Sequence, residues 1–331
     1  MSFKIRILPS GQEFRSQAKS SVLRAGLREG VNLEHNCANG SCGVCKARLI
    51  EGDLEQIRSH DYRLNLSEQD KGWFLMCCQR ATSDLLIETR ASNQAADIPE
   101  QHVTAKTGKI EKLQDGVMQL NVRTPRSKGL QFLAGQGVSL HFDGMRPKHL
   151  PIASCPCESI QLRFHVRRRA NDPFSEFLFE RLKKGRELVI SGPLGEFTLN
   201  EASSRPIVFV AWESGFAPVA SLIEHVIQKD PEREIHLYWL SGIPQGHYLS
   251  NHCRAWRDAL DNFHYHSIGL RPAGPNTFES IFSEISQRHR PLAAWDLYLA
   301  IPAAEQYRAC SLLCEAGMPA QQMRLALLQH A

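Results

Sequence analysis

The sequence predicts a multidomain protein in which a small mixed α+β domain precedes an antiparallel β-barrel and an α/β domain with a parallel sheet. Three observations support this fold class. The 331 residues are more than one hydrophobic core usually organises. Residues 102–201 contain short strand patterns separated by Gly and Pro, which is typical of an antiparallel barrel. Beyond them, a continuous apolar run at 206–212 leads into a helical pattern, as in a βαβ unit.

The first domain is expected to span residues 1–92. Its elements are predicted as strands at 3–8, 13–15, 46–50 and 85–89 and a helix at 21–29. Apolar and basic residues alternate along the first segment, which indicates a half-buried strand, and Ser10-Gly11 then reverses the chain. Gly30 stands where a helix commonly ends. A hairpin, a helix and further strands therefore form a small mixed sheet.

A short polar segment separates this domain from the barrel, and residues 93–101 are assigned to the linker. The barrel, residues 102–201, is predicted from strands at 103–113, 118–123, 137–142, 161–166 and 188–191. The α/β domain, residues 202–331, is predicted from strands at 206–212, 235–240 and 297–301 and helices at 216–228 and 303–315. Strands that alternate with helices favour parallel pairing.

A group of cysteines lies in the stretch Cys37-Ala-Asn-Gly-Ser-Cys42-Gly-Val-Cys45, and two adjacent cysteines follow in Phe-Leu-Met-Cys77-Cys78-Gln. Three thiolates at C-x4-C-x2-C with a distant fourth have the plant-type spacing that holds a [2Fe-2S] cluster. Structural zinc is the alternative, but zinc usually takes two closely spaced ligand pairs, and this stretch has one. The spacing therefore predicts a one-electron carrier.

Small residues between the cysteines agree with a cluster loop. Thiolates and bridging sulfides carry negative charge that backbone N–H groups must stabilise, so Gly40, Ser41 and Gly43 suit a main chain lying close to the cluster. Bulkier residues would hold these amides away. The six cysteines not needed for the cluster are expected to be buried core thiols, and the fourteen histidines show no metal-binding spacing.

Composition and charge exclude several other classes of protein. A net charge of +4, with Lys and Arg spread along the chain, does not indicate nucleic-acid binding. The N-terminal residues lack a signal-peptide pattern, and no apolar run is long enough to predict membrane insertion. Ten cysteines in a chain of this length do not resemble a secreted disulfide scaffold. A reducing cytoplasmic location is the expectation.

The whole domain order resembles ferredoxin-NADP reductase-type flavoproteins with a fused N-terminal ferredoxin, as in the CDP-6-deoxy-glucoseen reductase-like group and the reductase components of bacterial oxygenases. The landmarks are Phe132-Leu-Ala-Gly135-Gln136, Ile152-Ala-Ser154, Leu162-Arg-Phe-His165-Val166-Arg167 and Gly192-Pro193-Leu-Gly195-Glu-Phe197. The resemblance implies a β-grasp ferredoxin domain, an FAD-binding barrel and an NAD(P)H-binding α/β domain.

The resemblance also implies which cysteine is the fourth ligand. In such ferredoxin domains the last cysteine stands five residues before a Thr-Ser-Asp or Leu-Ser-Asp turn. Thr82-Ser83-Asp84 then assigns Cys77 as the ligand, alongside Cys37, Cys42 and Cys45. Cys78 is interpreted as a small buried side chain beside the cluster.

The flavin motif of this family departs from its usual form in the present chain. Relatives carry Arg-x-Tyr-Ser before an Ile-Ala-Ser strand, where arginine holds phosphate, the ring packs on the flavin and serine bonds near its reactive nitrogen. Here Lys148, Leu150 and Pro151 take those places, followed by Ile152. Lysine keeps the positive charge without the bidentate fork, and proline has neither hydroxyl nor N–H.

Two further segments complete the implied flavin site. His165, Val166 and Arg167 stand on the barrel strand that normally faces the flavin. A glycine-rich turn at a helix start, where N–H groups meet the pyrophosphate, is replaced by Asn171-Asp172-Pro-Phe174-Ser175. Asp172 adds a charge of the wrong sign for an anion, for which the neighbouring arginines can compensate.

The nicotinamide site departs further from the family pattern. The usual Gly-Gly-Thr-Gly-Ile-Ala-Pro turn appears as Trp212-Glu213-Ser214-Gly215-Phe216-Ala217-Pro218, which keeps Gly215 and Pro218 but exposes the dinucleotide phosphates to Glu213. A Gly-Ala-Arg segment is replaced by residues 240–242, and a Cys-Gly-Pro-Pro motif by residues 300–303. Dinucleotide binding is therefore altered or lost.

These features predict an iron-sulfur flavoprotein that passes electrons from NADH or NADPH through FAD and the [2Fe-2S] cluster to a redox partner such as an oxygenase or desaturase. NADH is favoured because no arginine is placed to hold a 2′-phosphate. A hydride delivers two electrons and a cluster accepts one, which explains the pairing of cofactors. Two alternatives stay open: an electron carrier that no longer binds NAD(P)H, and a non-catalytic iron-sulfur subunit of a larger complex.

Overall fold

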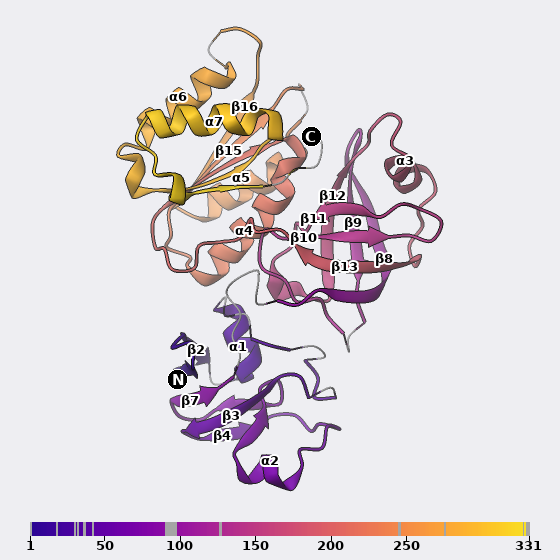
Figure 1. Cartoon of the computed structure of the whole chain (residues 1–331), viewed down its shortest axis with the longest axis vertical. Coiled ribbons are helices and arrows are strands. Elements are labelled where there is room, and N and C mark those ends of the chain that lie inside the picture. The colour runs from indigo at the N-terminus through magenta and orange to yellow at the C-terminus, as the bar shows by residue number, and fades with distance from the viewer. Residues whose placement is uncertain are drawn as a thin grey trace.

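The computed structural model describes residues 2–17, 19–29, 31, 33–35, 38–41, 43–89, 98–125, 128–243, 246–274, 276–326 and 328. Three large sheets divide these residues into three bodies (Figure 1). The first body lies at one end of the molecule, and the barrel and the α/β body lie side by side at the other. The predicted fold class is confirmed, whereas the predicted linker lies mostly outside the described residues.

The first body is a mixed sheet in the order β2-β1-β7-β3-β5, with a small β4-β6 pair beside it. Its elements are β1 (Ser2–Leu8), β2 (Glu13–Gln17), α1 (Val22–Arg28), β3 (Lys46–Glu51), β4 (Leu54–Gln56), α2 (Leu66–Asp70), β5 (Trp73–Leu75), β6 (Gln79–Ala81) and β7 (Leu85–Glu88). Among the described strands of this body, only the β1-β7 pair is parallel. Alternation along β1 buries Ile5 and Ile7, as predicted.

The second body is a six-stranded antiparallel sheet in the order β11-β10-β13-β8-β9-β12. Its elements are β8 (Gln101–Gln114), β9 (Val117–Arg123), β10 (Gly137–His141), β11 (Lys148–Pro151), the 3-10 turn η2 (Pro156–Glu158), β12 (Gln161–Arg167), α3 (Pro173–Glu180) and β13 (Glu187–Leu194). Ala153 N donates to Arg163 O at 2.8 Å, which brings the chain beyond β11 back to β12 and curls the sheet into a barrel.

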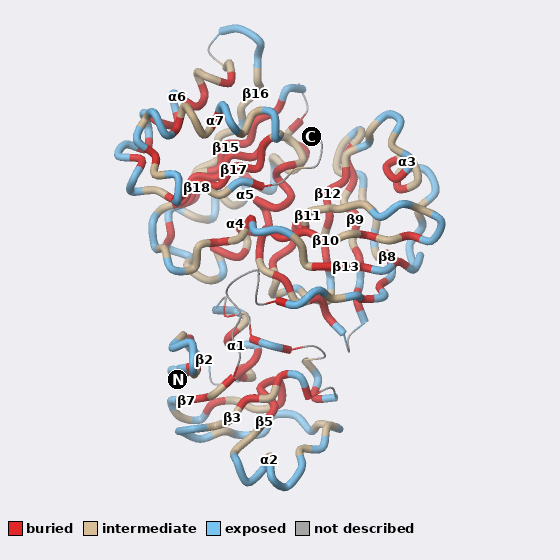
Figure 2. The backbone as a smooth tube through the Cα atoms, in the orientation of Figure 1, coloured by how far each residue is buried: buried red, intermediate tan, exposed pale blue. Residues whose placement is uncertain are grey.

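The third body is a parallel sheet in the order β16-β15-β14-β17-β18. Its elements are β14 (Ile207–Trp212), η3 (Glu213–Gly215), α4 (Phe216–Lys229), β15 (Ile235–Ser241), α5 (Ser250–Ala259), β16 (Phe263–Gly269), α6 (Phe278–Arg288), η4 (Leu292–Ala294), β17 (Asp296–Ala300), α7 (Ala303–Glu315), η5 (Ala320–Gln322) and β18 (Met323–Leu325). Buried residues run along β15 and β17 through its centre (Figure 2).

Three differences from the predicted elements are informative. The strand β8 begins at Gln101, inside the predicted linker. A strand was expected at Ile152-Ala-Ser154, but the strand in this region, β11, ends at Pro151, directly before that segment. The edge strand β16 was not predicted, since its polar sequence FHYHSIG lacks the apolar character of a buried strand.

The helix α4 joins the third body to the barrel. Ser221 Oγ donates to Ser154 O at 2.7 Å and accepts from Gly135 N at 3.3 Å. One turn further along α4, the Glu224 carboxylate accepts from Arg163 Nη2, which lies 2.6 Å from Oε1 and 2.5 Å from Oε2. Glu224 Oε2 also accepts from the backbone N–H of Cys155 at 3.1 Å. These buried contacts fix the two bodies against each other.

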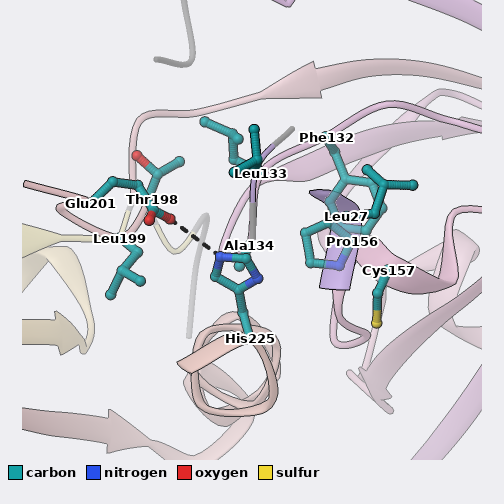
Figure 3. Close-up of a pocket in the computed structure, with 11 residues that line it drawn as sticks. Leu27, Phe132, Leu133, Ala134, Pro156, Cys157, Thr198, Leu199, Glu201 and His225 are labelled. Carbon is teal, nitrogen blue, oxygen red and sulfur yellow. Dashed lines mark hydrogen bonds and ion pairs between the residues drawn. The ribbon is translucent and has the colours of Figure 1, made fainter. Parts of the chain in front are cut away.

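All three bodies meet at a small cavity of about 20 Å³ (Figure 3). Leu27 and Val31 come from the first body, Phe132 and Pro156 from the barrel, and His225 from α4. The dashed line in Figure 3 joins His225 Nε2 to Glu201 Oε1 at 3.2 Å. A second link is Gln131 Nε2, which donates to His35 O at 2.5 Å. These contacts hold the first body against the other two.

A buried ion pair in the third body provides a stability test. Arg233 and Asp296 are 7% and 2% exposed, and their Nη2 and Oδ2 atoms lie 3.1 Å apart. Asp296→Ala leaves a buried guanidinium without its carboxylate, so the free energy of unfolding should fall by about 3–5 kcal/mol in denaturant titrations. The surface pair Arg257–Asp258 is the matched control, and Asp258→Ala should change the same quantity by less than about 1 kcal/mol. Equal effects of the two substitutions would contradict this interpretation.

Candidate metal centre and cofactor cleft

Three cysteine side chains are buried together beneath the loop that contains the predicted cluster ligands. Cys45, Cys77 and Cys78 are 1%, 4% and 0% exposed, and the Sγ atoms of Cys77 and Cys78 lie 3.5 Å apart. Hydrogen bonding with the Cys45 thiol is the largest cause that raises the pKa of Cys77, and burial raises it further. The predicted ligands Cys37 and Cys42 lie outside the described residues.

Two glycines let the loop lie close to these sulfurs. Gly40 has a φ of +92°, and a Cβ there would stand 2.6 Å from Cys78 Sγ. Gly43 has a φ of +73°, and its Cβ would stand 2.2 Å from the Tyr62 ring. Both backbones need glycine on conformational and steric grounds. The sequence predicted small residues that approach a cluster, and the structure adds Cys78 and Tyr62 as the groups they pack against.

Hydrogen bonds from the following segment hold the loop in place. Arg58 Nη1 donates to Ala38 O at 3.1 Å, and Tyr62 N donates to Gly40 O at 3.2 Å. Met76 N donates to Cys45 O at 3.0 Å. The described part of the site therefore offers buried sulfur donors, positive-φ glycines and a braced main chain. These features fit a [2Fe-2S] cluster.

A cavity of about 390 Å³ separates the cysteine group from the barrel. Cys77 lines it from the first body, and Cys157 of η2 lines it from the barrel side. Arg24 and Arg58 also line it and supply positive charge beside the sulfurs. The six cysteines outside the predicted ligand set were expected to be buried core thiols. This is confirmed for Cys78, Cys155 and Cys253, but it is wrong for the half-buried Cys157 and Cys310 and for the exposed Cys314. Only the folded chain shows that Cys157 faces the cluster domain.

The predicted phosphate-binding residues of the barrel lie together at the start of α3. Lys148 Nζ is 3.1 Å from Asp172 Oδ2, and the Ser175 hydroxyl accepts from Arg169 N at 2.8 Å. Within the described part of the chain, no side chain caps the N-terminus of α3, although Asp172 occupies the N-cap position. Uncapped N–H groups beside a lysine suit an anion such as a flavin pyrophosphate. The Lys148–Asp172 pair offsets part of that positive charge.

The predicted flavin strand meets the third body through aromatic and ionic contacts. His165 Nδ1 lies 3.2 Å from Tyr248 Oη, and the His165 ring stacks on Phe216 with centroids 6.2 Å apart. Burial, together with the positive charges of nearby residues, lowers the pKa of His165 to about 3. This ring is therefore neutral at physiological pH.

Glu213 stands at a position where the family pattern has a glycine. Its carboxylate forms an ion pair with Arg167 of the barrel. Glu213 has a φ of +48°, and its carbonyl accepts from Trp239 Nε1 at 3.0 Å. Beside it, Phe216 stacks on Trp239 with ring centroids 4.0 Å apart. The segment that normally approaches the dinucleotide is thus an interdomain contact in this chain.

Other predicted cofactor residues have packing roles in the structure. Ile152, Val166 and Phe174 belong to the barrel core, and Leu150 packs against it. Pro151 pairs with Gly137 in the sheet, and Pro218 is buried in α4. A Cβ on Gly215 would lie 2.2 Å from Ala300 O, so this position needs glycine for close approach to β17. Their roles in cofactor binding stay predictions.

The cysteine group and the three-body fold define an iron-sulfur oxidoreductase of the ferredoxin-reductase class. A family model described as the 2Fe-2S iron-sulfur cluster binding domain matches residues 5–82. The CDP-6-deoxy-L-threo-D-glycero-4-hexulose-3-dehydrase reductase of Yersinia pestis is 35% identical over 268 residues, which cover 80% of this chain and 79% of that protein. Reductase component 1 of the terephthalate 1,2-dioxygenase of Comamonas sp. is 30% identical over 265 residues, or 80% and 78%.

Solved structures agree on the fold. The Amycolatopsis cytochrome P450 reductase GcoB has a TM-score of 0.62 at 22% identity, and the ferredoxin reductase in carbazole 1,9a-dioxygenase has 0.60 at 21%. Each match covers 98% of both chains. The chain therefore belongs to the family of iron-sulfur reductases that includes the Yersinia dehydrase reductase and oxygenase reductase components.

The choice between the adjacent cysteines can be tested by substitution. If Cys77 is the ligand and Cys78 fills the space under Gly40, Cys77→Ser should abolish the visible absorbance of the cluster, whereas Cys78→Ser should retain it. Iron and sulfide content measured on the same samples checks the result. Loss of absorbance in Cys78→Ser with retention in Cys77→Ser would reverse the assignment.

The buried His165 predicts a pH dependence of stability. Because its pKa is lower in the folded chain, the unfolded chain binds more protons between about pH 6.5 and 3, so stability falls as pH decreases through that window. From pH 7 to 5, His165 alone should remove about 2 kcal/mol from the free energy of unfolding. His165→Gln should show a smaller loss over this pH range in denaturant titrations, and an unchanged loss would contradict the prediction.

Proposed function

We propose that this chain is an electron-transfer oxidoreductase that passes electrons from NAD(P)H through FAD and a [2Fe-2S] cluster to a protein acceptor. The observation that carries the proposal is the buried group of Cys45, Cys77 and Cys78 beneath Gly40, at a cavity shared with the barrel. Cys37, Cys42, Cys45 and Cys77 are the proposed cluster ligands. The names of its relatives, a dehydrase reductase and oxygenase reductases, support an oxygenase or related redox enzyme as the acceptor.

Flavin binding is proposed at the barrel edge that carries Lys148 and the N-terminus of α3. Lys148 and the first-turn N–H groups of α3 would hold the phosphates, and Arg167 would add positive charge nearby. His165 stays neutral and holds Tyr248 against this edge. When bound, the flavin supplies the chemistry that converts a two-electron hydride into single electrons.

The position of the first body favours transfer within the chain. Gln131 donates to His35 O, and Leu27 lines the junction with the barrel, so the first body is held against the barrel with the cysteine group at the cavity between them. Cys77 and Cys157 line one cavity, which places the cysteine group beside the barrel. The protein acceptor would approach the outer side of the cysteine loop, where Val44 is 37% exposed. The described helices include none with the length and apolar character to cross a bilayer.

A second candidate is an electron carrier that another protein reduces. The Glu213–Arg167 pair and the Phe216–Trp239 stack favour it, because they occupy the segment where the resembling family approaches the dinucleotide. A negative carboxylate at that place opposes phosphate binding. This candidate keeps the cluster and the flavin but removes NAD(P)H as the direct donor.

Visible spectroscopy of the purified protein under anaerobic conditions separates these candidates. If the proposed function is right, the spectrum should show cluster and flavin bands, and adding NADH or NADPH should bleach both. Flavin without bleaching by either nucleotide would support the second candidate. A cluster without flavin after reconstitution with FAD would instead indicate a non-catalytic subunit and overturn the proposal.

A further inference from the structure

Four histidines that are distant in the sequence form one group on the third body. His236 lies on β15, His264 and His266 lie on the edge strand β16, and His289 follows α6. The parallel register pairs His236 with His264, whose ring centroids are 4.3 Å apart. The rings of His266 and His289 lie 5.8 and 4.5 Å from that of His236. Sequence spacing could not show this group because pairing between strands creates it.

We propose that Glu234, His236 and His264 form a site for a transition-metal ion of the Zn²⁺ type. Glu234 Oε1 lies 3.0 Å from His236 Nε2 and 4.0 Å from His264 Nε2. One ligand atom from each of the three side chains lies within 4.8 Å of the others. This site is separate from the cysteine group, which belongs to the first body.

The distances suit the chemistry of zinc. Zn²⁺ binds imidazole nitrogen and carboxylate oxygen at about 2.0–2.2 Å, so two ligands in tetrahedral geometry stand about 3.3–3.5 Å apart. The distances from Glu234 Oε1 to the two Nε2 atoms, 3.0 and 4.0 Å, lie on either side of that value. Two nitrogen donors with one carboxylate favour zinc or a neighbouring transition metal over Mg²⁺ and Ca²⁺, which prefer oxygen ligands.

The nitrogen atoms that face Glu234 are the Nε2 atoms of His236 and His264, and these are the ligand atoms of the proposed site. The other ring nitrogen of His236, Nδ1, is buried without a hydrogen-bond partner among the described residues, so no hydrogen bond to another described residue ties this ring through that atom. Arg288 lies near the group, but its Nη2 is paired with Glu284 Oε1 at 3.1 Å, which limits its repulsion of a cation.

The place of the site in the sheet indicates a structural role. β16 is the edge strand and pairs only with β15 among the described strands. An ion bound by Glu234 and His236 on one side and by His264 on the other would connect the edge strand to its neighbour. Such a connection protects an otherwise polar, weakly packed edge from separation.

The test uses the full-length protein with its cluster loaded, titrated with Zn²⁺ alone in a calorimeter. Wild type should bind one equivalent outside the cluster and show a higher melting temperature with Zn²⁺. His264→Asn and Glu234→Gln, both at partly exposed positions, should weaken that binding by at least about tenfold and lose the thermal shift. The matched control is His102→Asn, at an exposed histidine of the barrel, which should bind as wild type does.

Two results would overturn the proposal. One is the absence of Zn²⁺ binding by wild type, and the other is equal affinity in wild type, His264→Asn and Glu234→Gln, which would locate bound zinc elsewhere. Cluster absorbance recorded during each titration shows whether zinc displaces iron from the cysteines. A parallel titration with Mg²⁺ should give no comparable heat, and equal binding of Mg²⁺ would contradict the nitrogen-ligand assignment.

Discussion

Close approach of a main-chain loop to buried sulfur atoms is the constraint on which the structure of the first body depends. A Cβ at Gly40 or Gly43 would overlap Cys78 or Tyr62, and both residues adopt positive φ. The donors that hold this loop come from Met76, directly after β5, and from Arg58 and Tyr62 in the segment after β4. The small sheet and α1 can be understood as the support for this loop.

Close packing also determines the contact between the barrel and the third body. In place of the glycine-rich turn of the family pattern, this chain has Glu213 and Phe216. Glu213 pairs with Arg167 of the barrel, and the Phe216 ring stacks on His165 of the barrel and on Trp239 of its own body. Ser221 and Glu224 of α4 continue that contact to the barrel backbone. Charge and aromatic packing that would disfavour a dinucleotide therefore also hold the two bodies together.

Local patterns were enough to predict much of the fold, because burial follows the period of each element. The alternation of β1, the apolar run of β14 and the helical spacing of α4 and α7 all matched the structure closely. The predictions failed where neighbours rather than local sequence decide conformation. The polar strand β16 pairs only because β15 offers it an edge, and β11 is a strand through its register with β10.

The sequence by itself determined the chemistry of the first body, because the spacing of four cysteines and the glycines between them is specific to a [2Fe-2S] cluster loop. It also determined the order of the three domains. Only the tertiary structure decided which charges meet: Lys148 with Asp172, Arg167 with Glu213, and Glu234 with His236 and His264. Such pairs join residues from separate strands and turns, so their interaction energy depends on distances that exist only after folding.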